Sequence, residues 1–161
     1  MRAIEIENIK KFTRELFIGE VFDNFCVTEA SFSTLTNITI DGHVNKDFMG
    51  EADLSLPENQ ETAVLWKKIK PLCFQIIKGQ RVPLRFKIVF MMPQETVIRF
   101  LDDEGLDMEP VEVNALFLNI KFENNKLVCT TGTSLRAFTL DKSLEDAWDC
   151  RMLKFLTEVQ E

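Results

Sequence analysis

The polar residues best suited to chemistry gather near the C-terminal end of the chain. Residues 130–134 read TTGTS, and Arg136 and residues 141–143 (DKS) follow. Hydroxyls and backbone N–H groups around a glycine can bind an anion, and an arginine can hold that anion through two hydrogen bonds. The run lacks the phosphate-loop pattern and does not lead straight into a helix. Two interpretations remain: two strands that meet at a glycine turn, or an anion site made by Thr131, Gly132, Thr133, Ser134 and Arg136.

The only histidine of the chain, His43, limits the catalytic schemes that are available. Asp41 precedes it by two residues on the same face of an expected strand, so an Asp–His contact is allowed and the pair could act as acid and base. The alternative is a polar strand surface. Acidic clusters at 102–104 and 107–112 lack the EF-hand spacing. We therefore expect no metal site and no cofactor.

Residues 66–93 form the only basic segment of an acidic chain. No acidic residue occurs between Glu61 and Glu95, although the whole chain has a formal charge of −7. Such a segment can bind an acidic or phosphate-bearing partner, or it can be neutralised by the acidic residues 50–62 that precede it. The residues expected to contact an anion or a partner here are Lys67, Lys70, Lys78, Arg81, Arg85 and Lys87.

Composition is that of a folded protein without membrane segments. The chain has 161 residues, 45% of them hydrophobic and 28% charged, which suits a single domain with halves at 1–79 and 80–161. Four widely spaced cysteines favour buried thiols over disulfides. The N-terminus lacks a leader pattern and no run of 18 apolar residues exists, so we expect a cytoplasmic protein.

Hydrophobic periodicity predicts an α+β fold. Strands are expected at 3–6, 25–32, 37–45, 84–92, 116–122, 127–131 and 136–140. About four helices are expected, at 8–19, 63–78 with a kink or break at Pro71, 94–103 and 143–159. Residues 50–62 are expected to be a loop. The order β-α-β-β-α-β-α-β-β-β-α favours helices packed on a largely antiparallel sheet and allows an internal duplication.

Three stretches carry a resemblance to a known family. They are IKGQRVPLRFKIVF, TIDGHVNKDF and CTTGTSLRAFTLDKSLEDAWD. With them the chain resembles, along essentially its whole length, a family of small cytosolic proteins of unknown function from anaerobic Gram-positive bacteria. The resemblance implies no catalytic residues.

These observations favour a non-catalytic binding module whose basic patch takes an acidic or phosphate-bearing partner. That partner would be another protein or an anionic ligand, with nucleic acid less favoured and no membrane. One alternative is a module similar to DNA sliding clamps, which are also acidic and built from repeated β-α-β-β-β units. Another is an enzyme that acts on a phosphorylated small molecule through Arg136, Lys142 and the Thr/Ser hydroxyls, with Asp41 or His43 as acid and base.

Overall fold

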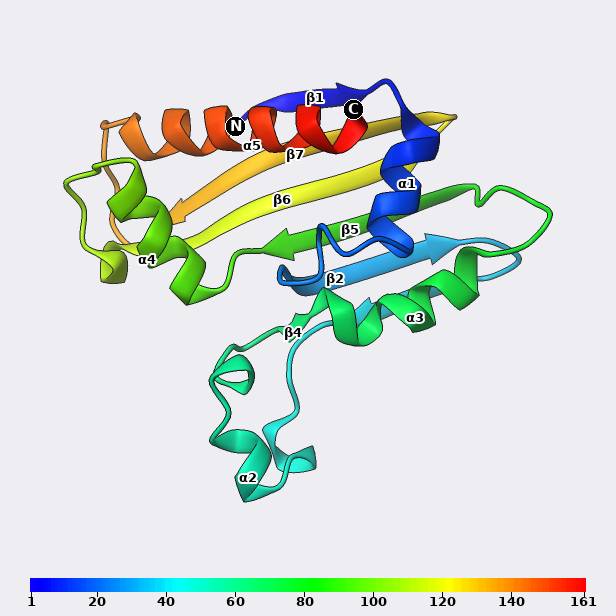
Figure 1. The fold of residues 1–161 in the computed structure, drawn as a ribbon, viewed down its shortest axis with the longest axis horizontal. Coiled ribbons are helices and arrows are strands. Elements are labelled where there is room, and N and C mark those ends of the chain that lie inside the picture. The colour runs from blue at the N-terminus through cyan, green and yellow to red at the C-terminus, as the bar shows by residue number, and fades with distance from the viewer.

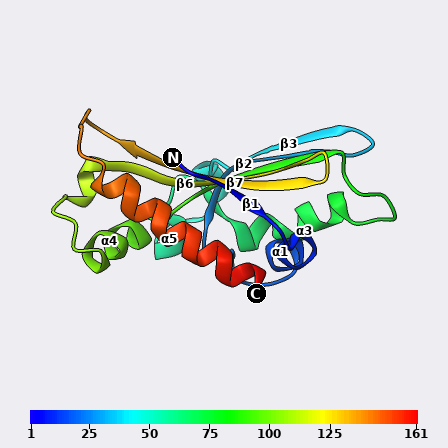
Figure 2. The same cartoon turned by 90° about the horizontal axis from the view of Figure 1, so that it is seen from above.

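In the computed structural model the chain forms one antiparallel sheet of seven strands, with its long helices on one face (Figures 1 and 2). The structure describes the backbone of residues 1–161 and every side chain except that of Glu58. The strands are β1 (Ala3–Ile6), β2 (Cys26–Ser33), β3 (Asn37–Asp41), β4 (Val64–Leu65), β5 (Arg85–Met91), β6 (Val113–Glu123) and β7 (Lys126–Leu135). Their order is β1-β7-β6-β5-β2-β3, and β4 pairs with β2.

The predicted α+β class is confirmed, but the structure has five α-helices instead of about four. They are α1 (Ile9–Phe17), α2 (Glu51–Leu54), α3 (Trp66–Ile77), α4 (Gln94–Asp103) and α5 (Ser143–Gln160). The additional helix, α2, lies in the acidic segment that was expected to be a loop. This segment extends away from the sheet (Figure 1).

The C-terminal strands differ from the prediction. A single strand, β7, continues through Gly132 to Leu135, because its ladder with the long strand β6 extends to Val113. The expected strand at 136–140 is absent, and Phe138 and Leu140 are exposed there. The residues 130–134 therefore lie within a strand instead of at a turn.

The helix predicted at 63–78 begins later and is not broken. Residues Val64–Leu65 pair with β2 as β4, and α3 then runs through Pro71 as one helix. Burial of Trp66 and Cys73 holds α3 against the sheet on both sides of the proline. Leu72, which the periodicity places on the apolar stripe, is 57% exposed.

The core lies between the sheet and the helices. Aromatic rings fill much of it: Phe90 packs edge-to-face on Trp66, and Phe17 packs edge-to-face on Phe86. Three cysteines (Cys26, Cys73 and Cys129) are buried, as predicted, while Cys150 is exposed. Burial raises the pKa of the Cys73 thiol to about 12, so this thiol is a core filler and not a nucleophile.

The opposite face of the sheet carries no helix in the described part of the chain (Figure 2). Side chains alternate along a strand, so this uncovered face is built from every second residue. From the strand registers these residues include Glu29, Ser31 and Ser33 on β2, Arg85, Lys87, Val89 and Met91 on β5, Ala115, Phe117, Asn119, Lys121 and Glu123 on β6, and Lys126, Val128, Thr130, Gly132 and Ser134 on β7. None of the described helices has the length and apolar character needed to cross a membrane.

Candidate functional site

The basic residues of the segment 66–93 do not form one surface. Lys67 and Lys70 belong to α3 on the helical layer, whereas Arg85 and Lys87 lie on the uncovered face of the sheet. Lys78 ends α3, and Arg81 lies in the following loop. The sheet therefore separates the positive charges that are contiguous in the sequence.

Lys70 has a structural role. Its Nζ donates to the Asp23 carboxylate at 2.5 Å and to the Gly19 carbonyl at 2.6 Å, and its side chain is only 12% exposed. Both partners lie in the segment after α1, so the ammonium connects this segment to α3. On the same helix, Lys68 Nζ lies 3.5 Å from Asn59 Oδ1 in the acidic segment. These contacts leave the sheet-face cations as the stronger candidates for an external anion.

A hollow of about 280 Å³ on the uncovered face contains two cations of the segment, Arg85 and Lys87, and a third from β6, Lys121. We call it the basic hollow; its polar lining consists of Ser31, Ser33, Arg85, Lys87, Lys121 and Glu123. The register brings these residues together. Lys87 of β5 lies opposite Ser31 of β2 and Lys121 of β6, and Arg85 lies opposite Ser33 and Glu123.

The charges in the basic hollow are unbalanced. Lys121 makes an ion pair with Glu123 at 3.2 Å, but Arg85 and Lys87 have no carboxylate at ion-pair distance among the described side chains. Two lysines, Lys87 and Lys121, face each other across the β5–β6 ladder. Like charges directly opposite each other destabilise a sheet. The hollow thus concentrates three cations and one carboxylate on a protein whose overall charge is negative.

Sequence reasoning missed Lys121, Ser31 and Ser33. Lys121 is a single charge in an apolar strand, and the serines belong to a segment that reads as a core strand. Alternation along each strand could have placed them on a solvated face. Their position beside Arg85 and Lys87 depends on pairing between strands far apart in the sequence.

The residues 130–134 are divided between the two faces of the sheet, so they do not form one site. Thr131 is buried on the helical face, where its hydroxyl donates to the Asp149 carboxylate of α5 and accepts the Arg2 N–H at 2.8 Å. Thr133 shares that face. Gly132 and Ser134 lie on the uncovered face, and Ser134 Oγ accepts a hydrogen bond from Asn114 at 3.1 Å. Thr131 therefore connects β7 to the residue that precedes β1 and to α5.

Asp41 and His43 make the contact that their spacing allows. The Asp41 carboxylate accepts the backbone N–H of His43 at 2.9 Å and lies 2.6 Å from its Nδ1. Both side chains are exposed, at 77% and 69%. The backbone N–H first, and the ring second, lower the pKa of Asp41 below the usual range of an aspartate.

We expect the Asp41 carboxyl to titrate below the usual aspartate range in carbon-detected NMR of the folded protein. The folded-state pKa is lowered, so the contribution of Asp41 to stability is present above the unfolded pKa and is lost as pH falls through the folded pKa. In His43→Ala the backbone N–H remains, so only part of the shift should disappear. An Asp41 pKa equal to that of the denatured chain would contradict this assignment.

A second polar pocket lies where β5 ends and α4 begins. We call this cavity of about 420 Å³ the end pocket; it is lined by His43, Arg136, Glu61, Thr28, Asn114 and Phe117, among others. The structure thus brings together His43 and Arg136, which are 93 positions apart in the chain. Asp41 does not line this pocket, but it contacts His43, which does.

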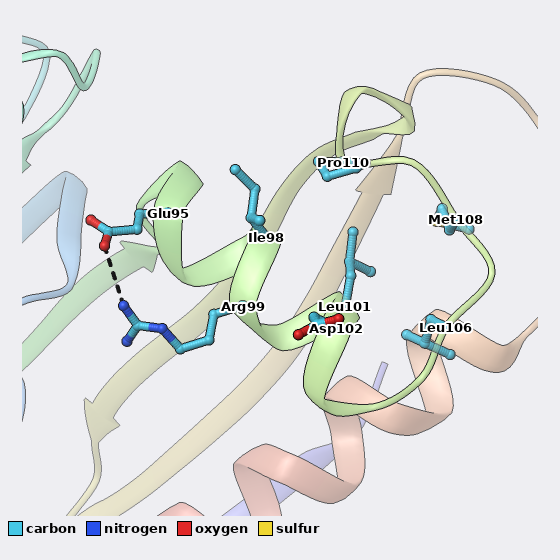
Figure 3. Close-up of a pocket in the computed structure, with 8 residues that line it drawn as sticks. All are labelled: Glu95, Ile98, Arg99, Leu101, Asp102, Leu106, Met108 and Pro110. Carbon is cyan, nitrogen blue, oxygen red and sulfur yellow. Dashed lines mark hydrogen bonds and ion pairs between the residues drawn. The ribbon is translucent and has the colours of Figure 1, made fainter.

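A third hollow, of about 460 Å³, lies between α4 and the loop that follows it (Figure 3). Two of its three charged groups satisfy each other, because Arg99 pairs with Glu95 at 3.2 Å one helical turn away, and Asp102 is the third. Ile98, Leu106 and Met108 supply the apolar part of its wall. This groove therefore offers fewer uncommitted polar groups than the basic hollow or the end pocket.

Comparison with known proteins places the chain in a family. A family model described as "Family of unknown function (DUF5721)" matches residues 15–160. No curated protein and no solved structure matches the chain. The expectation of an uncharacterised family, drawn from the three sequence stretches, is confirmed. Because the match extends over almost the whole length, the chain belongs to this family of unknown function, DUF5721.

Proposed function

We propose that this protein is a non-catalytic binding module that holds a phosphate-bearing partner in the basic hollow. The observation that carries the proposal is the Lys87–Lys121 pair, two like charges opposed across adjacent strands beside Arg85. An anion bound between the two ammonium groups turns this repulsion into attraction. The partner is a ligand or a macromolecule that presents phosphate groups.

The residue types that line the basic hollow favour a phosphate group over a single carboxylate as the bound anion. An arginine can hold phosphate oxygens with two hydrogen bonds, and each lysine adds a point charge. The hydroxyls of Ser31 and Ser33 supply neutral donors beside Arg85 and Lys87. Three cations against one carboxylate leave enough positive charge to balance a doubly charged group.

The test is isothermal titration calorimetry with two probes at low salt, inorganic pyrophosphate and a short single-stranded oligonucleotide. We expect pyrophosphate to bind, and to bind more weakly as salt is raised, because the contacts are exposed and screened. Tighter binding of the oligonucleotide, with a steeper salt dependence, would identify nucleic acid as the phosphate-bearing partner. Absence of binding by both probes at low salt would rule the proposal out.

A sharper prediction concerns Lys87→Gln. Removal of one of the two opposed charges should raise the free energy of unfolding by roughly 0.2–1 kcal/mol in the ligand-free protein. The same change should weaken pyrophosphate binding about fivefold, which corresponds to about 1 kcal/mol. Chemical denaturation and calorimetry measure the two effects separately.

The matched control is Lys10→Gln, which removes the same charge from an exposed position of α1 on the helical layer. This control should leave both stability and pyrophosphate binding nearly unchanged. If Lys87→Gln lowered stability, or if both variants weakened binding equally, the opposed lysines would not be the anion site.

A further inference from the structure

The end pocket is built around two irregularities of the sheet. The β2–β5 register passes from Val27 to Glu29 and leaves Thr28 without a partner, and the β6–β7 register passes from Val113 to Ala115 and leaves Asn114 without one. Each of these β-bulges turns its extra residue out of the ladder, and both extra residues line the end pocket. Bulges are frequent next to active sites because they redirect side chains.

Some polar groups around the end pocket already make hydrogen bonds within the protein, and others do not. One oxygen of Glu61 accepts the backbone N–H of Gln94 at 2.8 Å, at the first residue of α4. Arg136 has no ion-pair partner among the described side chains, and it is exposed. His43 uses Nδ1 on Asp41, which leaves Nε2 without a hydrogen-bond partner among the same side chains.

An apolar wall completes the pocket. Phe117 and Met91 lie directly opposite each other on β6 and β5, and both are only half-buried. On the other side of Phe117 the register places Gly132, which has no side chain to cover the ring. Aromatic and thioether groups of this kind favour contact with an apolar or aromatic body.

We propose that the end pocket binds a small organic carboxylate, whose acid group pairs with Arg136 and whose apolar or aromatic body lies against Phe117 and Met91. A single guanidinium matches one carboxylate through two hydrogen bonds. A doubly charged phosphate fits less well, because the Glu61 carboxylate shares the pocket and would repel it. Asn114 already donates one amide hydrogen to Ser134, so its side-chain oxygen and second amide hydrogen, together with His43 Nε2, are available to a polar substituent. The cavity of about 420 Å³ has the size of a small-molecule site.

The test follows backbone amide shifts of the isotope-labelled protein during titration with three probes that share a phenyl ring and are similar in size: phenylacetate, phenylacetamide and phenyl phosphate. We expect phenylacetate to move the signals of Arg136, Asn114 and Phe117 at the lowest concentration. Phenylacetamide lacks the charge and phenyl phosphate carries a second one, so both should bind more weakly. Equal affinity for all three probes, shifts elsewhere on the protein, or no shift with millimolar phenylacetate would overturn the proposal.

The variant that tests the acid contact is Arg136→Gln, an exposed substitution that should leave the fold intact. Phenylacetate affinity should fall about tenfold, the usual range for loss of a charge-assisted hydrogen bond. The control, Arg81→Gln, removes the same charge from an exposed loop outside the pocket and should not change the affinity. Lys87→Gln should also leave phenylacetate binding unchanged, since the two sites are independent. Equal losses in Arg136→Gln and Arg81→Gln would show attraction by overall charge and contradict the site.

Discussion

The Gly42→Ala variant is expected to be strongly destabilised. A Cβ atom at this position would lie 1.7 Å from the Val27 carbonyl oxygen and 2.7 Å from its carbonyl carbon. Both are backbone atoms of β2, so no rotation of a side chain relieves the overlap. The backbone would have to move, at the expense of the hydrogen bonds from Gly42 N to Thr28 O (2.9 Å) and from Val64 N to Gly42 O (2.8 Å).

We expect a loss of about 3 kcal/mol in the free energy of unfolding, at the upper end of the usual range for an added methylene. For a protein of this size the corresponding fall in Tm is roughly 6–12 °C. Chemical and thermal denaturation followed by circular dichroism measure the effect. The matched control is Gly50→Ala, where a Cβ atom meets nothing within 4 Å and stability should change by less than about 0.5 kcal/mol.

A backbone shift at Gly42 should also change the end pocket. It lies between Asp41 and His43 and is bonded to the bulged residue Thr28. Displacement at Gly42 therefore moves His43 relative to Thr28. In any fraction of Gly42→Ala that folds, phenylacetate should bind more weakly than in the parent protein. Equal stability of Gly42→Ala and Gly50→Ala would show that β2 and the chain at Gly42 are not in this close contact.

The Trp66→Ala variant should lose about 3–5 kcal/mol of stability, the usual range for truncation of a buried large aromatic residue. Trp66 is fully buried and packs edge-to-face against Phe17 and Phe90. Its indole N–H donates to the Leu16 carbonyl at 2.7 Å. The side chain thus fills the space between α1, α3 and the sheet and satisfies a carbonyl near the end of α1. Denaturation followed by circular dichroism measures the loss. Circular dichroism is preferred to tryptophan fluorescence because the substitution removes one of the two tryptophans.

Two further variants separate packing from hydrogen bonding. Trp66→Phe keeps an aromatic ring but leaves the Leu16 carbonyl without the indole donor, which should cost about 1–3 kcal/mol. Leu72→Ala truncates an apolar side chain of the same helix that is 57% exposed, and it should cost far less than Trp66→Ala. Similar losses for Leu72→Ala and Trp66→Ala would mean that α3 faces the sheet differently.

Several ends of helices and strands are marked by local signals in the sequence. Asn8 caps α1 by accepting the Lys11 N–H at 3.2 Å, and Gly105, with φ of +62°, follows α4. Asn124 and Asn125 have φ of 53° and 60° in the tight turn between β6 and β7. Each of these features depends on residues within one or two turns of chain, so the sequence is sufficient to predict it.

Boundaries that depend on distant partners were predicted wrongly. The β7 strand extends through Gly132 because β6 is long enough to pair with it, and residues 136–140 stay irregular because they have no partner strand. The short strand β4 forms because Val64 and Leu65 pair with β2. None of these outcomes is visible in the periodicity of the segment itself.

The same distinction holds for the candidate sites. Alternation in 85–91 already places Arg85 and Lys87 on one face of a strand, and the order of helices and strands already indicates an α+β protein. Only the tertiary structure places Lys121 opposite Lys87, separates these cations from Lys70, and brings Arg136 to His43. The direction of a side chain is a local property of the backbone. The neighbours of that side chain depend on the order and register of strands that are distant in the sequence.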